Sequence, residues 1–474
     1  MNKNKNKIKV TFVGTNSEDV TGSMTLIEFN NKKILLEAGL FQSGSPIEEY
    51  KNNSRRLGFN PRDVDYIFIG HTHMDHAGML PRLYAMGCTA KIIAPRNTSV
   101  LYNKIIRNSL SCILETCDIV HKEHGISTRP IYNTDDIENT LNNMHEYGYN
   151  DIIKLDDEVS FKFIPSGHVI ASAQILLIIN NNNHIKKFLY TSDLGNINLY
   201  KPYVTEFERC EKADLVIGEC TYSGVDKYIT QKYRDKDMEK IETVISKTVS
   251  DKGKVLIASF SFDRLPTIIT AVYLKFKDNK DFDTDVYIDT PLGMDLCREY
   301  PKILTGEDLA LWEDVMNWKF LHFVKSHKDS LSLQASRKPM VVIASSGFMD
   351  AGRSKVWAKS IIPRSNNHII FIGFCNENSL AYKIKNPKKY PKIKIDRGNY
   401  KNRCGITDLK SFSSHMQKKD LLDYYSSINS EKIALVHSDF DNKCKFAKEL
   451  QLEVSKKNNT SKVVPVNKST IIYI

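Results

Sequence analysis

Residues 67–83 read IFIGHTHMDHAGMLPRL and place three histidines and an aspartate within six positions. The apolar run before them, VDYIFIG, predicts a buried strand that delivers His71 at its end. On the loop after such a strand, His71 and His73 can converge on one ion, while Asp75 and His76 point to a second. Because imidazole and carboxylate are ligands that zinc accepts, the stretch favours a metal site over a solvated polar loop.

Three more apolar strands end in residues of the same kinds. His168 follows FKFIP, Asp193 follows KFLY, and His437 follows KIALV. Each one alone is as compatible with a hydrogen-bonded structural residue as with a metal ligand. Together with HTHMDH they make seven groups at strand ends, which is a complete set for two metals. A carboxylate can bridge two ions about 3.5–4 Å apart that share a hydroxide.

The length and the order of predicted elements indicate more than one compact unit. A chain of 474 residues is longer than one ordinary domain, so two units, or one with an insertion, are expected. The first 200 residues alternate short strands with helices, including a helix from 97 to about 116. From about 214 helices alternate with apolar strands, which is typical of a parallel sheet covered by helices. From about 394 strands return, and the predicted fold class is layered α/β.

Composition narrows the class of protein further. Apolar residues make up 41% and charged residues 26% of the chain, as in globular proteins. No apolar run approaches the roughly 20 residues that span a bilayer, and MNKNKNKIKV lacks the apolar stretch of a secretory signal. We therefore expect a cytoplasmic protein with no membrane partner. Nine cysteines without a CxxC pair indicate neither a disulfide framework nor a cysteine-based zinc site.

The net charge of +11 favours an anionic partner, with nucleic acid as the first choice. The densest basic run is KIKNPKKYPKIKIDR, residues 383–397. A solvated loop is an equally good interpretation of this run.

Motifs along nearly the whole chain resemble a known family. HxHxDH, a glycine-preceded histidine and the YTSD strand end are similar to the metallo-β-lactamase fold. GECTY, SGFMDAGR, SSHMQ and LVHS resemble motifs of the β-CASP group, its nucleic-acid-processing branch, as do the earlier VTGS and ILLEAGLFQ. The chain resembles most the bacterial and archaeal ribonucleases related to the pre-mRNA 3′-end cleavage endonuclease. The resemblance implies an αββα sandwich, formed by 1–208 and 394–474, with an inserted α/β β-CASP cap at 209–393.

The resemblance also implies a centre of two Zn²⁺ ions. Three ligands would hold one zinc, three the other, and Asp193 would bridge them: His71, His73 and His168 for the first, and Asp75, His76 and His437 for the second. Glu219 stands at motif A of the family, His415 at motif B and His437 at motif C. A histidine at motif C goes with RNA-directed members of the family.

Three positions depart from the family pattern. Glu37 stands where an aspartate is usual, and its longer side chain must still orient the ligand loop. Ser438 ends motif C and Ser192 precedes Asp193, each where glycine is common. None of the three changes removes a proposed metal ligand.

The implied activity is hydrolysis of single-stranded RNA by an endonuclease, with 5′-3′ exonuclease cleavage as an additional mode. A hydroxide shared by two zincs would attack phosphorus in line, leaving a 5′-phosphate and a 3′-hydroxyl. Histidine, with an ordinary pKa of about 6.5, suits protonation of the leaving oxygen, and His415 is the candidate. Glu219 would orient it and favour its protonated form, and Asp75 and Glu37 complete the predicted catalytic set.

Substrate contacts are predicted on three turns. Ser345, Gly347 and Arg353 belong to ASSGFMDAGR, a strand followed by a glycine-containing turn that can cradle a phosphate with backbone N–H groups. SFSSH adds the hydroxyls of Ser413 and Ser414, and FDR adds Arg264. For each of these residues a plain turn or a surface ion pair is the alternative. HKEHG, with His121 and His124, matches no family motif and predicts a surface helix end.

Two other functions are open to this sequence. One is a lactamase-fold hydrolase of small thioesters or lactones, which the cap, His415 and the basic charge argue against. The other is a non-catalytic RNA-processing subunit, which the presence of all seven ligands argues against. The oligomeric state is open, with a homodimer as one alternative.

Overall fold

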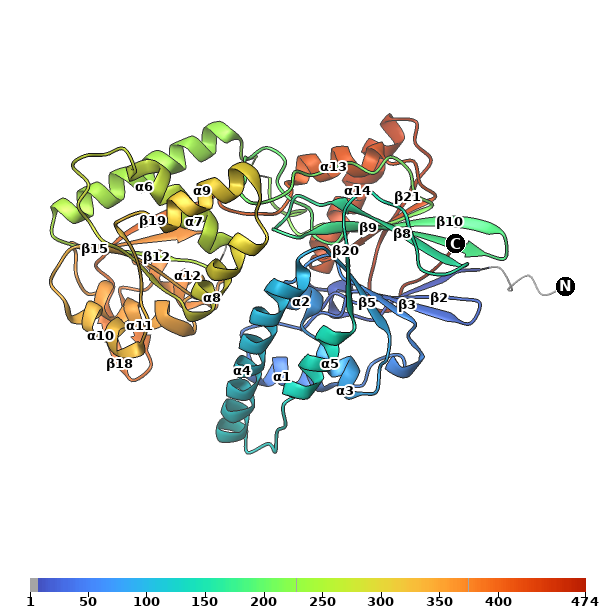
Figure 1. Cartoon of the computed structure of the whole chain (residues 1–474), viewed down its shortest axis with the longest axis horizontal. Helices are drawn as coiled ribbons and strands as arrows, with labels where there is room; N and C mark the ends of the chain where they lie inside the picture. The colour runs from blue at the N-terminus through green and yellow to red at the C-terminus, as the bar shows by residue number, and fades with distance from the viewer. Residues whose placement is uncertain (1–6, 227, 374) are drawn as a thin grey trace. The chain divides into compact units, whose positions relative to one another are not determined.

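The structure, a computed structural model, describes residues 7–226, 228–373 and 375–474. The described residues form two compact units (Figure 1). Unit 1 comprises 1–197, 204–228 and 414–474, and unit 2 comprises 198–203 and 229–413. The predicted mixed α/β class is confirmed.

Unit 1 contains two seven-stranded sheets. The first has the order β22-β1-β2-β3-β4-β5-β6, with bounds Ile471–Tyr473, Lys9–Phe12, Thr25–Phe29, Lys32–Leu36, Tyr66–Phe68, Lys91–Pro95 and Met144–Tyr147. The second has the order β21-β20-β11-β10-β9-β8-β7, with bounds Lys462–Pro465, Lys432–Val436, Leu215–Glu219, His184–Tyr190, Ala173–Asn181, Val159–Pro165 and Ile153–Lys154. The stretch NNNNH, residues 180–184, contains the turn that joins β9 to β10 as an antiparallel hairpin.

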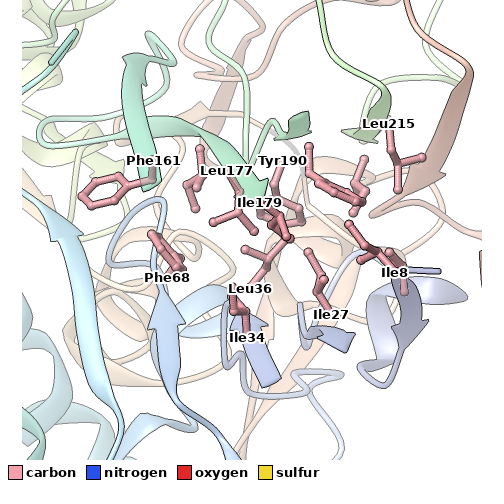
Figure 2. Close-up of a cluster of buried hydrophobic side chains, with 14 of the residues drawn as sticks. Ile8, Ile27, Ile34, Leu36, Phe68, Phe161, Leu177, Ile179, Tyr190 and Leu215 are labelled. Atoms are coloured by element: carbon pink, nitrogen blue, oxygen red, sulfur yellow. The ribbon is translucent and has the colours of Figure 1, made fainter. Parts of the chain in front are cut away.

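The core of unit 1 lies between these two sheets, as Figure 2 shows. Ile34 and Leu36 of β3 and Phe161 of β8 are fully buried there. The alternation of VSFKFIP explains β8, because Val159, Phe161 and Phe163 all point into this core. Each large apolar side chain buried in this way contributes about 1.5–3 kcal/mol.

Helices cover the outer faces of both sheets, giving the predicted αββα order. An apolar cluster joins the first sheet to its helices, and a second joins the other sheet to α13 and α14. The helices of the first sheet are α1 (Pro46–Ser54), α2 (Met74–Ala77), α3 (Leu80–Ala85), α4 (Thr98–His124) and α5 (Thr134–Asn142), with 3-10 turns η1 (Thr15–Ser17) and η2 (Pro61–Asp63). The helices of the second are α13 (Lys418–Ser427) and α14 (Phe440–Lys456).

The helix expected from 97 to about 116 is α4, which continues to His124. Gly125 ends it in the left-handed conformation with φ +64°, which glycine adopts without steric cost. His121 and His124 are exposed in its last turn, as predicted.

Unit 2 is built on a six-stranded, fully parallel sheet, as the alternation of helices and apolar strands predicts. The order is β14-β13-β15-β12-β16-β19, with bounds Leu321–Phe323, Val286–Asp289, Met340–Ala344, Lys254–Ala258, His368–Ile372 and Gly405–Leu409. A separate hairpin pairs β17 (Lys392–Ile395) with β18 (Gly398–Lys401). The helices are α6 (Gln231–Ser250), α7 (Arg264–Phe276), α8 (Pro291–Glu299), η3 (Tyr300–Lys302), α9 (Gly306–Met316), α10 (His327–Ala335), α11 (Gly352–Ile361) and α12 (Leu380–Lys385).

Strand pairing explains where the chain passes from one unit to the other. β11 pairs with β10 and β20, so the segment from 204 to 228 belongs to unit 1. β19 pairs with β16, so the chain belongs to unit 2 until 413. The main block of unit 2, 229–413, therefore begins and ends later than the predicted cap, 209–393, and the predicted domain borders stay predictions.

Two expectations from composition can be compared with the structure. All nine cysteines are free thiols, and most of them are buried. Within the described ranges, every helix is too short or too polar to cross a lipid bilayer.

Candidate metal centre

The ends of four strands in unit 1 and the short helix α2 carry the candidate ligands. His71 and His73 follow β4, His168 follows β8, and Asp193 follows β10. His437 follows β20, while Asp75 and His76 belong to the short helix α2. The structure brings these seven side chains together in two groups, each with its ligand atoms within 4.8 Å of one another, and a third group of Glu37, His71 and His76 shares one residue with each.

The first group contains His71, His73, His168 and Asp193. His71 Nε2 lies 2.9 Å from His73 Nδ1, and His168 Nε2 lies 3.4 Å from that same atom. Asp193 Oδ2 lies 3.8 Å from His71 Nε2 and 3.5 Å from His168 Nε2. The four side chains thus present their ligand atoms to one small volume, which suits a single cation.

The second group contains Asp75, His76 and His437. Asp75 Oδ2 lies 3.5 Å from both His76 Nε2 and His437 Nε2. The other carboxylate oxygen of Asp193, Oδ1, lies 3.3 Å from His76 Nε2. Asp193 therefore faces the first group with Oδ2 and the second with Oδ1, which is the arrangement of a bridging carboxylate.

Buried atoms without partners show that these residues fit a cation. Within the described part of the chain, Asp193 Oδ1, His76 Nε2 and His437 Nε2 are buried and accept or donate no hydrogen bond. A native protein seldom leaves a buried polar atom in this state, because each one costs about 1–3 kcal/mol. Divalent metal ions would satisfy all three atoms at once.

The electrostatics of the cluster point the same way. Burial lowers the pKa of His71 and of His168 well below the usual value, so both imidazoles are neutral and keep a lone pair. Burial also works to lower the pKa of His76, but Asp193 and Glu37 outweigh it and raise that pKa well above the usual value. The carboxylates therefore favour positive charge at this point of the site.

A single buried carboxylate, Glu37, is connected to both groups. Its Oε2 accepts from His76 Nδ1 at 2.6 Å and from the Tyr190 hydroxyl at 2.5 Å. Its Oε1 accepts from the Ser192 hydroxyl at 2.6 Å, and Ser192 Oγ lies 3.0 Å from His71 Nδ1. Because the one proton of Ser192 goes to Glu37, His71 Nδ1 must carry a proton and donate it to Ser192.

This hydrogen-bond pattern fixes the tautomers of two ligands. His71 and His76 both carry a proton on Nδ1. The neutral His71 therefore keeps its lone pair on Nε2, and His76, whose pKa is raised, would give up a proton from Nε2 when a metal ion binds there. The backbone φ angles of Glu37 and Ser192 are +61° and +48°. Both lie in the left-handed region, which is unfavourable for residues other than glycine. His437 shares this conformation with φ +60°.

The motif-A and motif-B segments lie beside the two groups: Thr221 of motif A contacts His437 of the second group, and the His415 ring lies 4.7 Å from the His168 ring of the first group. Thr221 Oγ1 lies 2.9 Å from His437 Nδ1 and so positions that ring. His415 Nδ1 lies 3.9 Å from Asp193 Oδ2 and 3.9 Å from Glu219 Oε1. Glu219 itself accepts from the backbone N–H groups of Leu194 and Thr221. His415 and Glu219 are thus in charge contact but not hydrogen-bonded.

The predicted substrate contacts fall in other surroundings. Ser345 Oγ donates to Thr290 Oγ1 at 2.9 Å, and the Arg353 side chain contacts Asp289 and His327. Arg264 donates to the Ile372 carbonyl and, with Gly347, lines a small pocket in unit 2.

The two serines of SFSSH are both buried. The Ser414 carbonyl accepts from Asn196 N–H, and Ser413 lies at the end of unit 2. A role of any of these residues in substrate binding stays a prediction.

Sequence reasoning missed three residues that hold the ligands: Tyr190, Ser192 and Thr221. Each stands next to a motif that was recognised, in LYTSD or GECTY, but a hydroxyl there carries no signal by itself. Only the fold shows that each one contacts a ligand or its carboxylate partner.

Comparison with known proteins places this site in a family. The description "Metallo-beta-lactamase superfamily" matches residues 18–85, "Beta-Casp domain" matches 267–384, and "Zn-dependent metallo-hydrolase RNA specificity domain" matches 399–463. The chain belongs to the β-CASP family of the metallo-β-lactamase fold. In this β-CASP protein, the first match contains Glu37 and HTHMDH, and the last contains His415 and His437. It is a metal-dependent hydrolase.

Relatives of this β-CASP hydrolase span most of its length. Ribonuclease TTHA0252 of Thermus thermophilus is 26% identical over 429 residues, covering 89% of this chain and 91% of the relative. Transcription termination factor FttA of Methanocaldococcus jannaschii is 24% identical, over 92% of this chain and 68% of its own. Integrator complex subunit 11 of Danio rerio is 22% identical, over 98% and 74%.

A solved structure supports the fold alone. The crystal structure of a protein of unknown function from Enterococcus faecalis has a TM-score of 0.54 and 12% identity. The match covers 99% of this chain and 100% of that one.

Proposed function

We propose that this β-CASP protein is a ribonuclease that hydrolyses single-stranded RNA with two zinc ions. The observation that carries the proposal is the position of His415, within 3.9 Å of the aspartate that faces both ligand groups. Such a site pairs a hydrolytic metal centre with a separate proton donor. The match to an RNA specificity domain and the name of the Thermus relative support RNA as the substrate.

The seven residues of the two groups would hold the ions. His71, His73 and His168 would bind one ion and Asp75, His76 and His437 the other, with one oxygen of Asp193 for each. When bound, the ions supply Lewis acidity, which activates water and offsets negative charge on the phosphoryl oxygens. Glu37 and Ser192 keep His71 and His76 in the tautomers that leave Nε2 available.

His415 is the residue that would move a proton. Its side chain is 18% exposed, whereas Asp193 beside it is 2% exposed, so a substrate can reach the imidazole. As general acid it would protonate the 3′ oxygen that leaves, giving a 3′-hydroxyl and a 5′-phosphate. Glu219 would act as a positioning residue, because two backbone N–H groups fix its carboxylate 3.9 Å from His415 Nδ1.

The test measures zinc per chain and the cleavage of three substrates: 5′-phosphorylated RNA, DNA of the same sequence and a generic thioester. We expect two zincs, cleavage of RNA, loss of cleavage in His73→Ala, and a loss of about 10²–10⁴-fold in kcat for His415→Ala with zinc retained. His184→Ala is the matched control, since His184 is exposed on the β9–β10 turn. Thioester turnover without RNA cleavage would instead support the small-molecule hydrolase.

Two finer features of the proposal need their own measurements. Equal cleavage of RNA with a free and a blocked 5′ end would indicate an endonuclease, while loss on blocking would indicate 5′-3′ exonuclease action. Light scattering would determine the oligomeric state, for which a homodimer is one alternative. The cytoplasmic location stays a prediction.

A further inference from the structure

The hairpin of β17 and β18 separates its apolar from its charged side chains completely. Ile393 and Ile395 are each 2% exposed and pack into an apolar cluster of unit 2. Lys392 and Lys394, which alternate with them, and Lys401 on the other strand are all exposed. The period of two residues in the strand therefore places these lysines together on the outer face.

The segment around the hairpin concentrates the positive charge of the protein. Residues 388–403 contain seven basic side chains and one acidic one, a net +6 against +11 for all 474 residues. The basic residues are Lys388, Lys389, Lys392, Lys394, Arg397, Lys401 and Arg403, and all seven are exposed. We call them the basic ribbon.

The basic ribbon carries no neutralising partners. Its one carboxylate, Asp396, is already bound by Lys355 at 2.9 Å and Lys359 at 2.6 Å, both from α11. Among the residues that the structure describes, no carboxylate lies within ion-pair distance of the seven. Ordinary surface lysines elsewhere in the chain do pair, as Lys418 does with Asp226 and Glu449.

The strand register brings two lysines of the basic ribbon close enough to repel each other. Lys392 lies directly opposite Lys401 in the antiparallel pair. Like charges in this relation face each other at about 4.5–5.5 Å between Cβ atoms and destabilise a hairpin. A bound polyanion would offset this cost. Lysines two positions apart on one strand are about 7 Å apart, which suits successive phosphates of an extended single strand.

The composition of the surface selects the class of partner. Among the described residues, no large exposed apolar side chain lies between Leu331 and Phe440. A membrane-inserting surface needs apolar side chains beside its charges, and the centre of a protein interface needs aromatic or aliphatic anchors. Charge without apolar anchors fits contacts to a phosphodiester backbone, which position a strand without reading its sequence.

We propose that the basic ribbon binds the phosphodiester backbone of single-stranded RNA, as a contact surface additional to the metal centre. The choice of RNA rests on the proposed ribonuclease function. The backbone contact itself does not, because it depends only on phosphate charge. The ribbon also borders α11, because the carbonyl of Ile362, the residue that follows this helix, accepts from the Arg403 backbone N–H at 2.9 Å. That contact and the Asp396 ion pairs fix the hairpin along α11 as a rigid surface.

The test compares two triple variants of the full-length protein that remove equal charge. Lys392→Ala/Lys394→Ala/Lys401→Ala removes ribbon lysines, and Lys445→Ala/Lys448→Ala/Lys462→Ala removes exposed lysines from α14 and β21 of unit 1. Fluorescence anisotropy measures binding of a labelled 20-nucleotide single strand. DNA is used with the metal-loaded protein, and RNA is used with EDTA to prevent cleavage.

We expect the ribbon variant to bind both strands about ten- to a hundredfold more weakly in 0.1 M salt. The slope of log K against log salt should fall by about 2, because each lysine at a phosphate of a single strand contributes about 0.7. The unit 1 variant should bind within about twofold of the unaltered protein. Equal losses in the two variants, or no loss in the ribbon variant, would overturn the proposal.

A lipid surface is tested in the same experiment. Vesicles of phosphatidylserine and phosphatidylcholine that bind in a ribbon-dependent way, while RNA binding is unchanged, would overturn RNA as the partner. Failure of the proposed function gives a different result. RNA binding that depends on the ribbon, without any RNA cleavage, would support the ribbon proposal and contradict the proposed ribonuclease function. RNA cleavage with an unchanged KM in the ribbon variant would support the ribonuclease function and contradict the ribbon proposal.

Discussion

The strand ends of unit 1 and those of unit 2 are both rich in polar side chains, but they differ in how these are satisfied. In unit 1, Asp193, His76 and His437 keep buried atoms without hydrogen-bond partners in the described structure. In unit 2, Asp289 at the end of β13 accepts from the Ser330 hydroxyl and from Trp357 Nε1 at 2.7 Å. Thr290 beside it accepts from Ser345 Oγ and from Gly293 N–H.

The difference distinguishes a ligand-binding site in unit 1 from structural hydrogen bonds in unit 2. Polar groups that satisfy one another hold a loop in place and need nothing further. Groups that face each other without partners leave a free-energy cost that only a ligand can offset. Changes in unit 1 should therefore alter metal binding and activity, and changes at the strand ends of unit 2 should alter stability.

The largest effect is expected from Asp193→Ala. This change removes the carboxylate whose two oxygens face the two ligand groups, so zinc content should fall and RNA cleavage should drop by about 10³-fold or more. Zinc per chain and single-turnover cleavage measure the two effects. Full zinc content in this variant would show that the two groups bind independently of Asp193.

The next effect is expected from Glu37→Gln, which tests whether one carboxylate supports both groups. The amide NH2 must face a donor, either the Ser192 hydroxyl or the pair formed by His76 and Tyr190. Zinc affinity should fall by about 10–100-fold, as for other partners of metal ligands. Competition with a chelator measures the zinc affinity. Loss of only one zinc ion would show that Glu37 supports only one of the two ligand groups.

Asp289→Ala is the matching change in unit 2. It leaves the Ser330 hydroxyl and the Trp357 N–H buried without an acceptor, so the free energy of unfolding should fall by about 2–4 kcal/mol. Urea denaturation measures the loss. Zinc content should not change. Zinc loss in the folded variant would contradict the claim that the strand ends of unit 2 affect stability but not metal binding.

A pH effect is expected from unit 2 as well. Burial lowers the pKa of His368 to about 4, with a smaller contribution from Lys247. The unfolded chain therefore binds a proton at this residue below about pH 6.5, while the folded chain does so only near pH 4. The free energy of unfolding should fall as the pH falls through this window, by about 1–3 kcal/mol. His368→Gln should make the fall smaller, and an unchanged pH profile would contradict the burial argument.

The smallest effect is expected from Ser192→Ala. Alanine still has a Cβ, so the unfavourable backbone conformation at 192 remains, but the hydrogen bonds that link Glu37 to His71 are lost. The affinity for one zinc ion should fall by about three- to tenfold, while the affinity for the other should not change. Cobalt titration with visible spectra can follow the two sites separately. Equal weakening of both would show that Ser192 acts through the backbone.

Much of this could be predicted from the sequence because the informative residues are of rare types in fixed patterns. The layered α/β class follows from the order of strands and helices, the αββα sandwich is implied by the resemblance to the metallo-β-lactamase fold, and HTHMDH with His168, Asp193 and His437 predicts the cluster that the structure brings together. Tyr190, Ser192 and Thr221 could not be predicted, since hydroxyls are common and their contacts depend on the fold. The borders of the units also depend on pairing partners of β11 and β19 that lie far away in the chain.

The left-handed backbone at Glu37, Ser192 and His437 has a consequence for the motions of unit 1. Non-glycine residues hold such a conformation at a cost of about 1 kcal/mol or more each, so these loops rely on their side-chain contacts to stay folded. Metal binding would add its own constraint at two of the three loops. Amide hydrogens around 192–194 and 437–438 should therefore exchange with deuterium fastest in chelated protein, which would make local opening a direct report of metal occupancy.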